Sequence, residues 1–263
     1  MVDIAPDLLV DVSADGVAVV RLNRPGHLNA LSRGLLSNIT TVFTELDRRR
    51  DVRAVVLRGA GGRAFSVGAD LKEMHARDAA EDPPYEPMRE ATRNPYETVL
   101  ECRKPTIAAL EGWVVGGGFE LAMACDLRVA TDTARFLMPE SKVGLGANFG
   151  SQMLPRLVPA GFAFEVLYLA EPFDAATGFR MGLLNRVTPP EQLDATVDAL
   201  VATLVSRAPV TLQRYKAMVH LGSSLPIATA LRLDPGPSPY LSEDRAEGTA
   251  AFRQKRTPQW SGR

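Results

Sequence analysis

Two glutamates beside glycine-rich turns are the residues of this chain best suited to acid/base chemistry. In the segment GWVVGGGFELA, a strand-like run leads into three consecutive glycines and then opens a helix whose first turn holds Glu120. Glu140 ends a second strand-like run, ARFLMPE. Both carboxyls have apolar neighbours, and burial raises a carboxyl pKa toward values that move protons near neutral pH. The alternative is a helix-capping glutamate at 120 and an exposed loop acid at 140.

Two glycine-containing turns could supply backbone donors next to these carboxyls. Gly116, Gly117 and Gly118 precede one helix, and the turn Ser66-Val67-Gly68-Ala69 leads into another that starts near Asp70. The first N–H groups of a helix have no partner within the helix, and its dipole favours negative charge there. Two such donors that converge on one point would form an oxyanion hole. The alternative is a pair of tight strand-to-helix turns that bind nothing.

Other common catalytic motifs are absent from the sequence. It contains no GxxxxGK[ST] phosphate loop, no GxGxxG dinucleotide fingerprint, no GxSxG elbow and no HExxH pair. The three histidines, His27, His75 and His220, are far apart and have no cysteine pairs near them. No metal site is therefore predicted, and each histidine is interpreted as a surface or packing residue.

Composition restricts the partners and the compartment. The 263 residues are 46% hydrophobic and carry a formal net charge of -1, so no basic excess points to nucleic acid or an anionic membrane. Two cysteines, Cys102 and Cys125, offer no disulfide framework. The chain begins without a basic and then apolar leader, and its apolar runs are shorter than the roughly 20 residues of a membrane helix. We expect a soluble cytoplasmic protein.

Hydrophobic periodicity predicts the elements that must position these groups. Strands are expected at 8–12, 17–22, 53–57, 106–110, 127–130 and 135–138, and helices at 35–46, 88–102 with a break near Pro95, and 119–124. This alternation predicts an α/β architecture with parallel strands. From residue 191 onward the pattern is helical, at 193–204, 210–221 and 242–255. We therefore divide the chain into an α/β core with the active site, 1–190, and a helical C-terminal region, 191–263.

One further segment has a distinct composition. Residues 77–87, RDAAEDPPYEP, are charged and rich in proline, which predicts an irregular loop.

Five segments in order resemble the enoyl-CoA hydratase/isomerase, or crotonase, superfamily. They are LNRPGHLNAL, AFSVGADLKEM, GWVVGGGFELAMACDLRVA, ARFLMPESKVGLG and AEGTAAFRQKRTP, and they extend over nearly the whole chain. The resemblance implies a crotonase-like ββα spiral core with a helical C-terminal oligomerisation region. It also implies self-association as a trimer or a dimer of trimers, and a place in fatty acid metabolism such as β-oxidation.

The same resemblance implies roles for individual residues. The backbone N–H groups of Ala69 and Gly117 would hold the thioester oxygen, and Glu120 and Glu140 would be the two catalytic glutamates. The CoA moiety of an acyl-CoA thioester substrate would lie against residues of the first two segments and of the C-terminal helix, namely Arg24, Leu28, Ala30, Ala64, Gly68, Asp70, Leu71 and Lys255. Basic residues of that helix, here Lys255 and Arg256, would reach the nucleotide of a neighbouring subunit. CoA belongs to the substrate, so no separate cofactor is expected.

The implied reaction is the reversible addition of water to a 2-enoyl-CoA. Alternatives are Δ3-Δ2 isomerisation, a different acyl-CoA dehydration or hydrolysis, ring-directed hydration, and a CoA-binding or RNA-binding protein without catalysis. The chain departs from the family where many hydratases read IPGAGGTQRL and it reads GANFGSQMLPRL. Asn148 and Phe149 replace small residues beside the acyl pocket, which leaves the acyl chain length and the reaction branch open.

Overall fold

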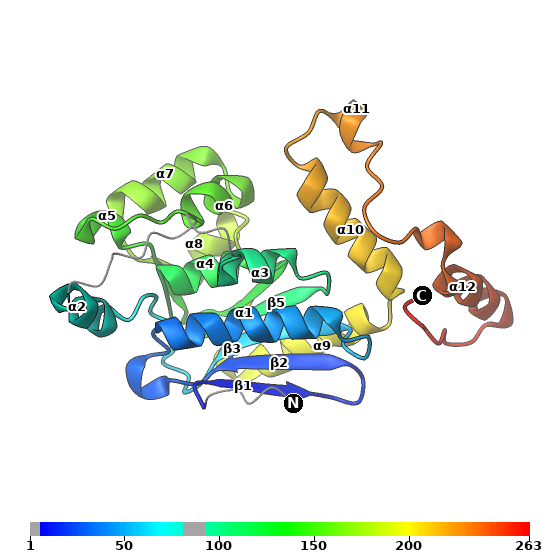
Figure 1. The fold of residues 1–263 in the computed structure, drawn as a ribbon, viewed down its shortest axis with the longest axis horizontal. Helices are drawn as coiled ribbons and strands as arrows, with labels where there is room; N and C mark the ends of the chain where they lie inside the picture. The colour runs from blue at the N-terminus through cyan, green and yellow to red at the C-terminus, as the bar shows by residue number, and fades with distance from the viewer. Residues whose placement is uncertain (1–5, 81–92) are drawn as a thin grey trace.

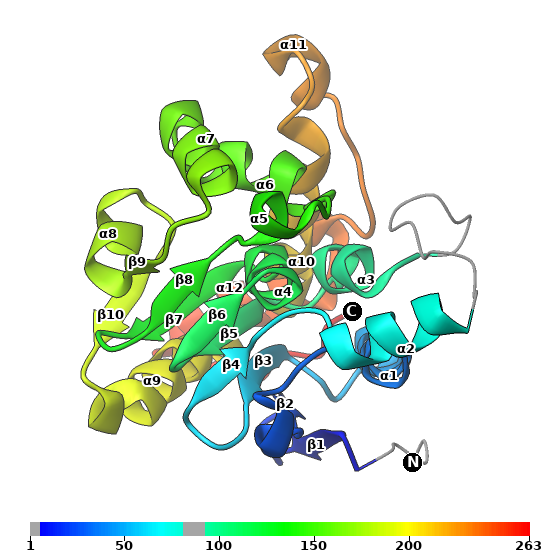
Figure 2. The same cartoon turned by 90° about the vertical axis from the view of Figure 1, so that its left-hand side faces the viewer.

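The computed structural model describes residues 6–80 and 93–263, which form two β-sheets with helices packed around them (Figure 1). The six-stranded sheet has the order β1 (Leu8–Val12), β2 (Val17–Leu22), β3 (Ala54–Gly59), β5 (Thr106–Leu110), β7 (Leu127–Thr131), β10 (Arg186–Thr188). The four-stranded sheet has the order β4 (Ala64–Ser66), β6 (Trp113–Val115), β8 (Arg135–Leu137), β9 (Phe173–Asp174). Figure 2 shows these four strands side by side.

Most neighbouring strands are parallel, as the alternation of strands and helices predicted. The exceptions in the described chain are two antiparallel pairs, β1 with β2 and β8 with β9. The first is a hairpin whose turn contains Gly16 at φ 83°, a conformation that glycine adopts without strain. The short turn at Gly16 requires the first pair to be antiparallel. The expectation of parallel strands is wrong for β8 and β9, which α5, α6 and α7 separate along the chain.

Helices surround both sheets. They are α1 (Arg33–Arg48), α2 (Leu71–Ala79), α3 (Pro95–Glu101), α4 (Gly117–Ala124), α5 (Glu140–Val143), α6 (Gly150–Leu157), α7 (Ala160–Leu169), α8 (Ala175–Arg180), α9 (Leu193–Val205), α10 (Pro209–Gly222), α11 (Ile227–Ala230) and α12 (Glu243–Gln254). Short 3-10 helices lie at Pro25–His27, Pro190–Gln192 and Pro239–Leu241. Sequence periodicity did not predict α6, α7 or α8.

The main core lies between one face of the six-stranded sheet and helices α1, α3 and α4. Helix α1 begins at Ser32, whose side chain accepts a hydrogen bond from the N–H of Leu35. Its buried face consists of the apolar residues that the sequence pattern identified: Leu35, Ile39, Val42, Phe43 and Leu46. A second, smaller core lies on the other face, where Leu193, Val197 and Val201 of α9 pack against β3, β5 and β7. Helix α9 therefore packs directly on the sheet.

Several predicted boundaries change in the structure. Helix α2 continues to Ala79, so the irregular loop predicted from Arg77 is helical at its start, and its residues 81–87 lie outside the described chain. Helix α3 begins at Pro95 with Asn94 as its cap, as the predicted break near Pro95 required. Residues 88–92 of that predicted helix also lie outside the described chain. The division at residue 190 into core and helical region stays a prediction.

No single helix in the described chain is long and apolar enough to cross a membrane. A bent helix pair, Pro190–Val205 with Pro209–Gly222, meets the length and composition test only as two segments at 104° to each other.

Candidate active site

Three neighbouring parallel strands bring the predicted site residues together. Strand β6 lies between β4 and β8, with Ser66 paired to Val114 and Val115 paired to Leu137. The segments that follow the three strands begin at residues 67, 116 and 138, so they leave the same edge of the sheet. Sites at the carboxyl ends of parallel strands are common for this reason. The glycine turns and both glutamates belong to these segments.

Glu120 is a buried carboxylate in the first turn of α4. Its side chain is only 7% exposed, and its Oε1 accepts a hydrogen bond of 2.7 Å from the N–H of Gly150, the first residue of α6. Burial raises the pKa of Glu120 to about 7, backbone N–H groups of Gly150 and Phe149 oppose that rise, and the nearby Glu140 carboxylate adds to it. Glu120 does not cap its own helix, because the N-cap of α4 is Gly116 and no side chain caps it.

Glu140 opens helix α5 and turns back toward the glycine loop. Its Oε2 is buried and has no hydrogen-bond partner among the described residues. A Cβ on Gly116 would come within 2.7 Å of Glu140 Oε1, so this carboxylate lies directly against the glycine turn. Burial raises the pKa of Glu140, although its own backbone N–H partly offsets the rise. Both carboxyls are thus shielded from water, and Glu140 lies close enough to Glu120 to raise its pKa.

The two backbone donors lie on loops that touch each other. Gly68 has φ 80°, and a Cβ at that position would lie 2.8 Å from the carbonyl oxygen of Val115 and 3.0 Å from the nitrogen of Gly117. Among the described residues, neither the Ala69 N–H nor the Gly117 N–H donates to a protein acceptor. Ala69 itself is solvent-exposed. Both N–H groups are therefore available to a ligand oxygen.

A buried asparagine that the sequence reasoning missed holds this loop in place. Asn29 is fully buried and adopts φ 55°, a left-handed conformation that Asn tolerates better than most residues. Its side-chain amide donates to the carbonyl oxygens of Ala60 and Ala64, and its backbone carbonyl oxygen accepts from the Ser66 hydroxyl at 2.8 Å. Ser66 Oγ in turn accepts from the N–H of Gly68. Asn29 thereby links the segment LNRPGHLNAL to the turn Ser66-Val67-Gly68-Ala69.

Arg24 stabilises the same loop and is not a free cation. Its guanidinium donates to the carbonyl oxygen of Ala30 at 2.6 Å and to Asp70 at 2.9 Å, and it also pairs with Asp7. Burial alone would raise the pKa of Asp70, but the hydrogen bond from Arg24 brings it below its ordinary value. The structure therefore makes Arg24 and Asp70 positioning residues for the turn that contains Ala69.

The other residues predicted to border CoA fall into two places. Leu28 is half-buried and in the left-handed region at φ 49°, Ala64 is buried in β4, and Leu71 is exposed at the start of α2. Ala64 and Leu71 lie in the chain segment around Ala69, and the carbonyl oxygen of Leu28 accepts a hydrogen bond from the Val67 N–H. Lys255 ends α12, which Figure 1 places on the opposite side of the molecule from α2. Within one chain, Lys255 does not join the site.

Arg256, the neighbour of Lys255, is already paired within the chain. It donates to Glu247 in a two-pronged ion pair at 2.6 and 2.8 Å. This hydrogen bond, with a second from the N–H of Gln259, lowers the pKa of Glu247 to about 2. The C-terminal residues are thus folded back on α12.

An aromatic pair completes one wall of the site. Phe149 is 6% exposed, and its ring stacks on that of Tyr96 with a centroid distance of 5.5 Å. A Cβ on Gly117 would come within 2.6 Å of the Tyr96 hydroxyl. The sequence flagged Phe149 as a departure but did not indicate Tyr96, because no local pattern connects α3 to the glycine turn.

Nothing in the described chain resembles a metal centre. In residues 6–80 and 93–263, no group of three or more His, Cys, Asp or Glu side chains is arranged so that it could hold a metal ion. His220 lies 3.6 Å from Asp126, which also pairs with Lys216 at 2.9 Å.

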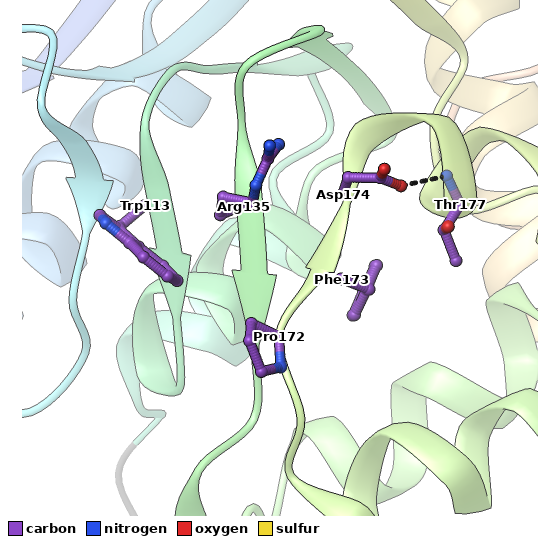
Figure 3. Close-up of a pocket in the computed structure, with 6 residues that line it drawn as sticks. All are labelled: Trp113, Arg135, Pro172, Phe173, Asp174 and Thr177. Atoms are coloured by element: carbon purple, nitrogen blue, oxygen red, sulfur yellow. Dashed lines mark hydrogen bonds between the residues drawn. The ribbon is translucent and has the colours of Figure 1, made fainter.

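A surface hollow elsewhere on the four-stranded sheet is separate from this site (Figure 3). It is lined by Trp113, Arg135, Pro172, Phe173, Asp174 and Thr177. Asp174 caps α8 by accepting from the Thr177 N–H at 2.8 Å, and Arg135 donates to the carbonyl oxygens of Thr133 and Ala134. Its charged groups are therefore occupied in holding the fold.

Known proteins resemble this chain over nearly all of its length. A family model for enoyl-CoA hydratase/isomerase matches residues 13–263. The short-chain-enoyl-CoA hydratase of Clostridium acetobutylicum is 37% identical over 243 residues, 91% of this chain and 92% of that protein. The (E)-benzylidenesuccinyl-CoA hydratase of Thauera aromatica is 34% identical over 252 residues, 94% of this chain and 96% of that protein. The solved enoyl-CoA hydratase of Bacillus anthracis superimposes with a TM-score of 0.88 at 30% identity, covering 98% of this chain and 100% of the other.

Proposed function

The chain belongs to the enoyl-CoA hydratase/isomerase family, and we propose that it adds water reversibly to the double bond of a 2-enoyl-CoA thioester. The observation that carries this proposal is the pair of carboxyls of Glu120 and Glu140, whose pKa values burial raises, beside two backbone N–H groups that have no acceptor among the described residues. A thioester oxygen and a water molecule are ligands that such a set of groups fits.

The backbone donors would act on the thioester oxygen. When water attacks C3, negative charge moves from the double bond onto that oxygen, and the N–H groups of Ala69 and Gly117 stabilise it. Because both donors are fixed by the packed loops around Gly68, they need no rearrangement during the reaction. Removing one such donor costs about 2.7–4 kcal/mol of transition-state stabilisation in comparable sites.

The glutamates would divide the proton transfers between them. One carboxylate takes a proton from water as the oxygen bonds to C3, and the other, protonated, gives its proton to C2. This requires one proton in the pair at the start, and the mutual repulsion of two close carboxylates favours that state. The pKa of Glu120 near 7 places this state in the neutral range. No cofactor is needed, since water and the thioester supply every bond that changes.

CoA would lie along the loop of residues 24–31 and the start of α2, and Lys255 would contact the nucleotide from a neighbouring chain. Two observations support the contribution of a neighbouring chain. Lys255 lies across the molecule from the site, and the C-terminal tail, helices α10 to α12, has an exposed apolar surface. Leu241 is 89% exposed and Phe252 is 86% exposed. We propose that these tail helices form a trimer or a dimer of trimers. Two buried free thiols, Cys102 and Cys125, support a reducing compartment such as the cytoplasm.

Hydration of crotonyl-CoA tests the reaction. The loss of enoyl absorbance with and without the protein, followed by identification of 3-hydroxybutanoyl-CoA, would support the hydratase. Conversion of a 3-enoyl-CoA to its 2-enoyl isomer without hydration would favour the isomerase instead. No change in either substrate would refute both reactions.

A further inference from the structure

The stacked rings of Tyr96 and Phe149 occupy a position that decides which acyl groups the site can hold. Tyr96 comes from α3, and Phe149 immediately precedes α6. Their interplanar angle is 30°, and the Phe149 ring is nearly inaccessible to solvent. We call these two side chains the aromatic wall.

The aromatic wall spans the distance between the two chemical groups of the site. At one end, the Tyr96 hydroxyl lies against Gly117, whose N–H faces the thioester oxygen in the proposed function. At the other end, the residue after Phe149 is Gly150, whose N–H binds the Glu120 carboxylate at 2.7 Å. The wall therefore runs alongside C1 to C3 of a bound enoyl group.

Two methionines close the space beyond Glu120. A Cβ on Gly150 would lie 2.8 Å from Met138 Cε and 3.4 Å from Met123 Cε, so both methyl groups pack where α6 begins. Met138 and Met123 are each only 1% exposed. An acyl chain that continues past the two carboxyls thus meets packed side chains on the α4 side and the rings on the α3 side.

We propose that the aromatic wall limits this enzyme to short 2-enoyl thioesters, and that Phe149 is the residue that sets this limit. The inference rests on the proposed function, since it assumes that an enoyl thioester occupies the site. A small side chain at position 149 would expose the face of the Tyr96 ring and open a passage between α3 and α6. Phe149 now covers that face, because its ring stacks on the Tyr96 ring.

The test compares chain-length profiles of the wild-type protein and Phe149→Ala. Hydration of 2-enoyl-CoAs with 4, 6, 8, 10 and 12 acyl carbons is measured as kcat/KM. In parallel, the affinities of the saturated butanoyl-CoA and dodecanoyl-CoA are measured by calorimetry, because binding does not depend on turnover. Phe179→Ala on the exposed surface of α8 is the matched control for deletion of a phenyl ring. Tyr96→Phe retains the stacked ring and removes only the hydroxyl.

The expected result is a wild-type preference of at least about tenfold for four carbons over twelve. In Phe149→Ala this ratio should fall by roughly fifteenfold, since each methylene that gains a buried place improves binding by about fourfold and the vacated space holds at least two. Phe179→Ala and Tyr96→Phe should keep the wild-type ratio. If Phe149→Ala does not fold, Phe149→Leu should give a smaller shift in the same direction.

The outcomes separate this inference from the proposed reaction. Equal efficiency of the wild-type protein on four and twelve carbons would overturn the wall and leave the hydratase standing. In a second outcome, the protein hydrates no substrate and yet binds butanoyl-CoA more tightly than dodecanoyl-CoA, with this order lost in Phe149→Ala. That result would support the limit on chain length set by Phe149 and refute the hydratase activity. An unchanged profile in both Phe149 variants would also overturn the wall.

Discussion

The candidate active site and the C-terminal tail, helices α10 to α12, depart in opposite ways from the rule that polar side chains are exposed and apolar side chains are buried. At the site, the polar carboxyl of Glu120 is buried and Oε2 of Glu140 has no partner in the described chain. In α10 to α12, apolar side chains such as Ile227, Leu241 and Phe252 are exposed. A buried polar group and an exposed apolar patch are the two informative departures from ordinary burial. Each fits the partner that we propose for it, the substrate in one region and a second copy of the chain in the other.

The two regions also differ in what holds them. The loop around Ala69 is held rigidly, because Asn29, Arg24 and Gly68 fix it through several hydrogen bonds. Helix α10, beyond α9, contacts the core through the ion pair between Lys216 and Asp126, and Lys216 also donates to the carbonyl oxygen of Lys104. Rigid placement suits transition-state stabilisation, whereas an exposed apolar surface suits association.

The largest expected effect is the loss of either carboxyl at the site. Glu120→Gln and Glu140→Gln should each reduce turnover of crotonyl-CoA by roughly 10²–10⁴-fold, because a positioned acid or base contributes about that much. The affinity for butanoyl-CoA should change little, since the backbone donors remain. Glu171→Gln, at an exposed surface ion pair, is the matched control. Full activity of both site variants would show that Glu120 and Glu140 are not the catalytic acid and base, and catalysis would no longer explain why Glu120 is buried.

A methyl group on Gly116 should act on the site through Glu140. The added Cβ would lie 2.7 Å from Glu140 Oε1, and the φ of 52° strains any residue other than glycine. Because a displacement of about 1 Å in a catalytic group can cost about 10²-fold, Gly116→Ala should lose activity by that order. Gly161→Ala in α7, where the added methyl meets nothing within 4 Å, should retain activity. Wild-type kinetics in Gly116→Ala would contradict the placement of Glu140.

The buried carboxyl of Glu120 should also make the folded protein less stable at high pH. The pKa of Glu120 is raised from 4.5 to about 7, so its stabilising contribution is fully present below pH 4.5 and is lost as the pH rises through 7. Glu120→Gln removes this loss and should raise the free energy of unfolding at pH 8 by about 3 kcal/mol, with no such gain at pH 4.5. Urea denaturation at one chain concentration measures both values. Equal effects at both pH values would show that burial does not shift this carboxyl.

The smallest expected effect concerns the tail. Leu241→Glu or Phe252→Glu should weaken self-association by at least about tenfold, since each places a charge where a buried apolar contact is expected. Light scattering measures the mass, with Phe179→Glu on α8 as the control outside the tail. If Lys255 serves a neighbouring site, dissociation should also weaken binding of acyl-CoA but not of acyl-pantetheine. A wild-type monomer at micromolar concentration would refute this part of the comparison.

Local sequence was sufficient for one half of the site. Glu120 and Gly117 follow a strand, a glycine run and a helix start within a few residues, so their spacing predicts their placement. Glu140 was also predictable, because it follows a strand that pairs in parallel with β6. The contacts of Tyr96 and Asn29 join segments far apart in the chain, and no local period encodes them. The position of Lys255 shows a second limit of prediction from one sequence, because the fold of a single chain does not bring Lys255 to the site.

The most direct test of the two-carboxyl mechanism is the double variant Glu120→Gln/Glu140→Gln, compared with each single variant on crotonyl-CoA under one set of conditions. Two groups that act on the same water molecule work as a unit, so removing the second should add little to the loss caused by the first. The mechanism predicts that the double variant is within about tenfold of the slower single variant. Losses that multiply, so that the double variant is slower than either single by a further 10²-fold or more, would contradict it.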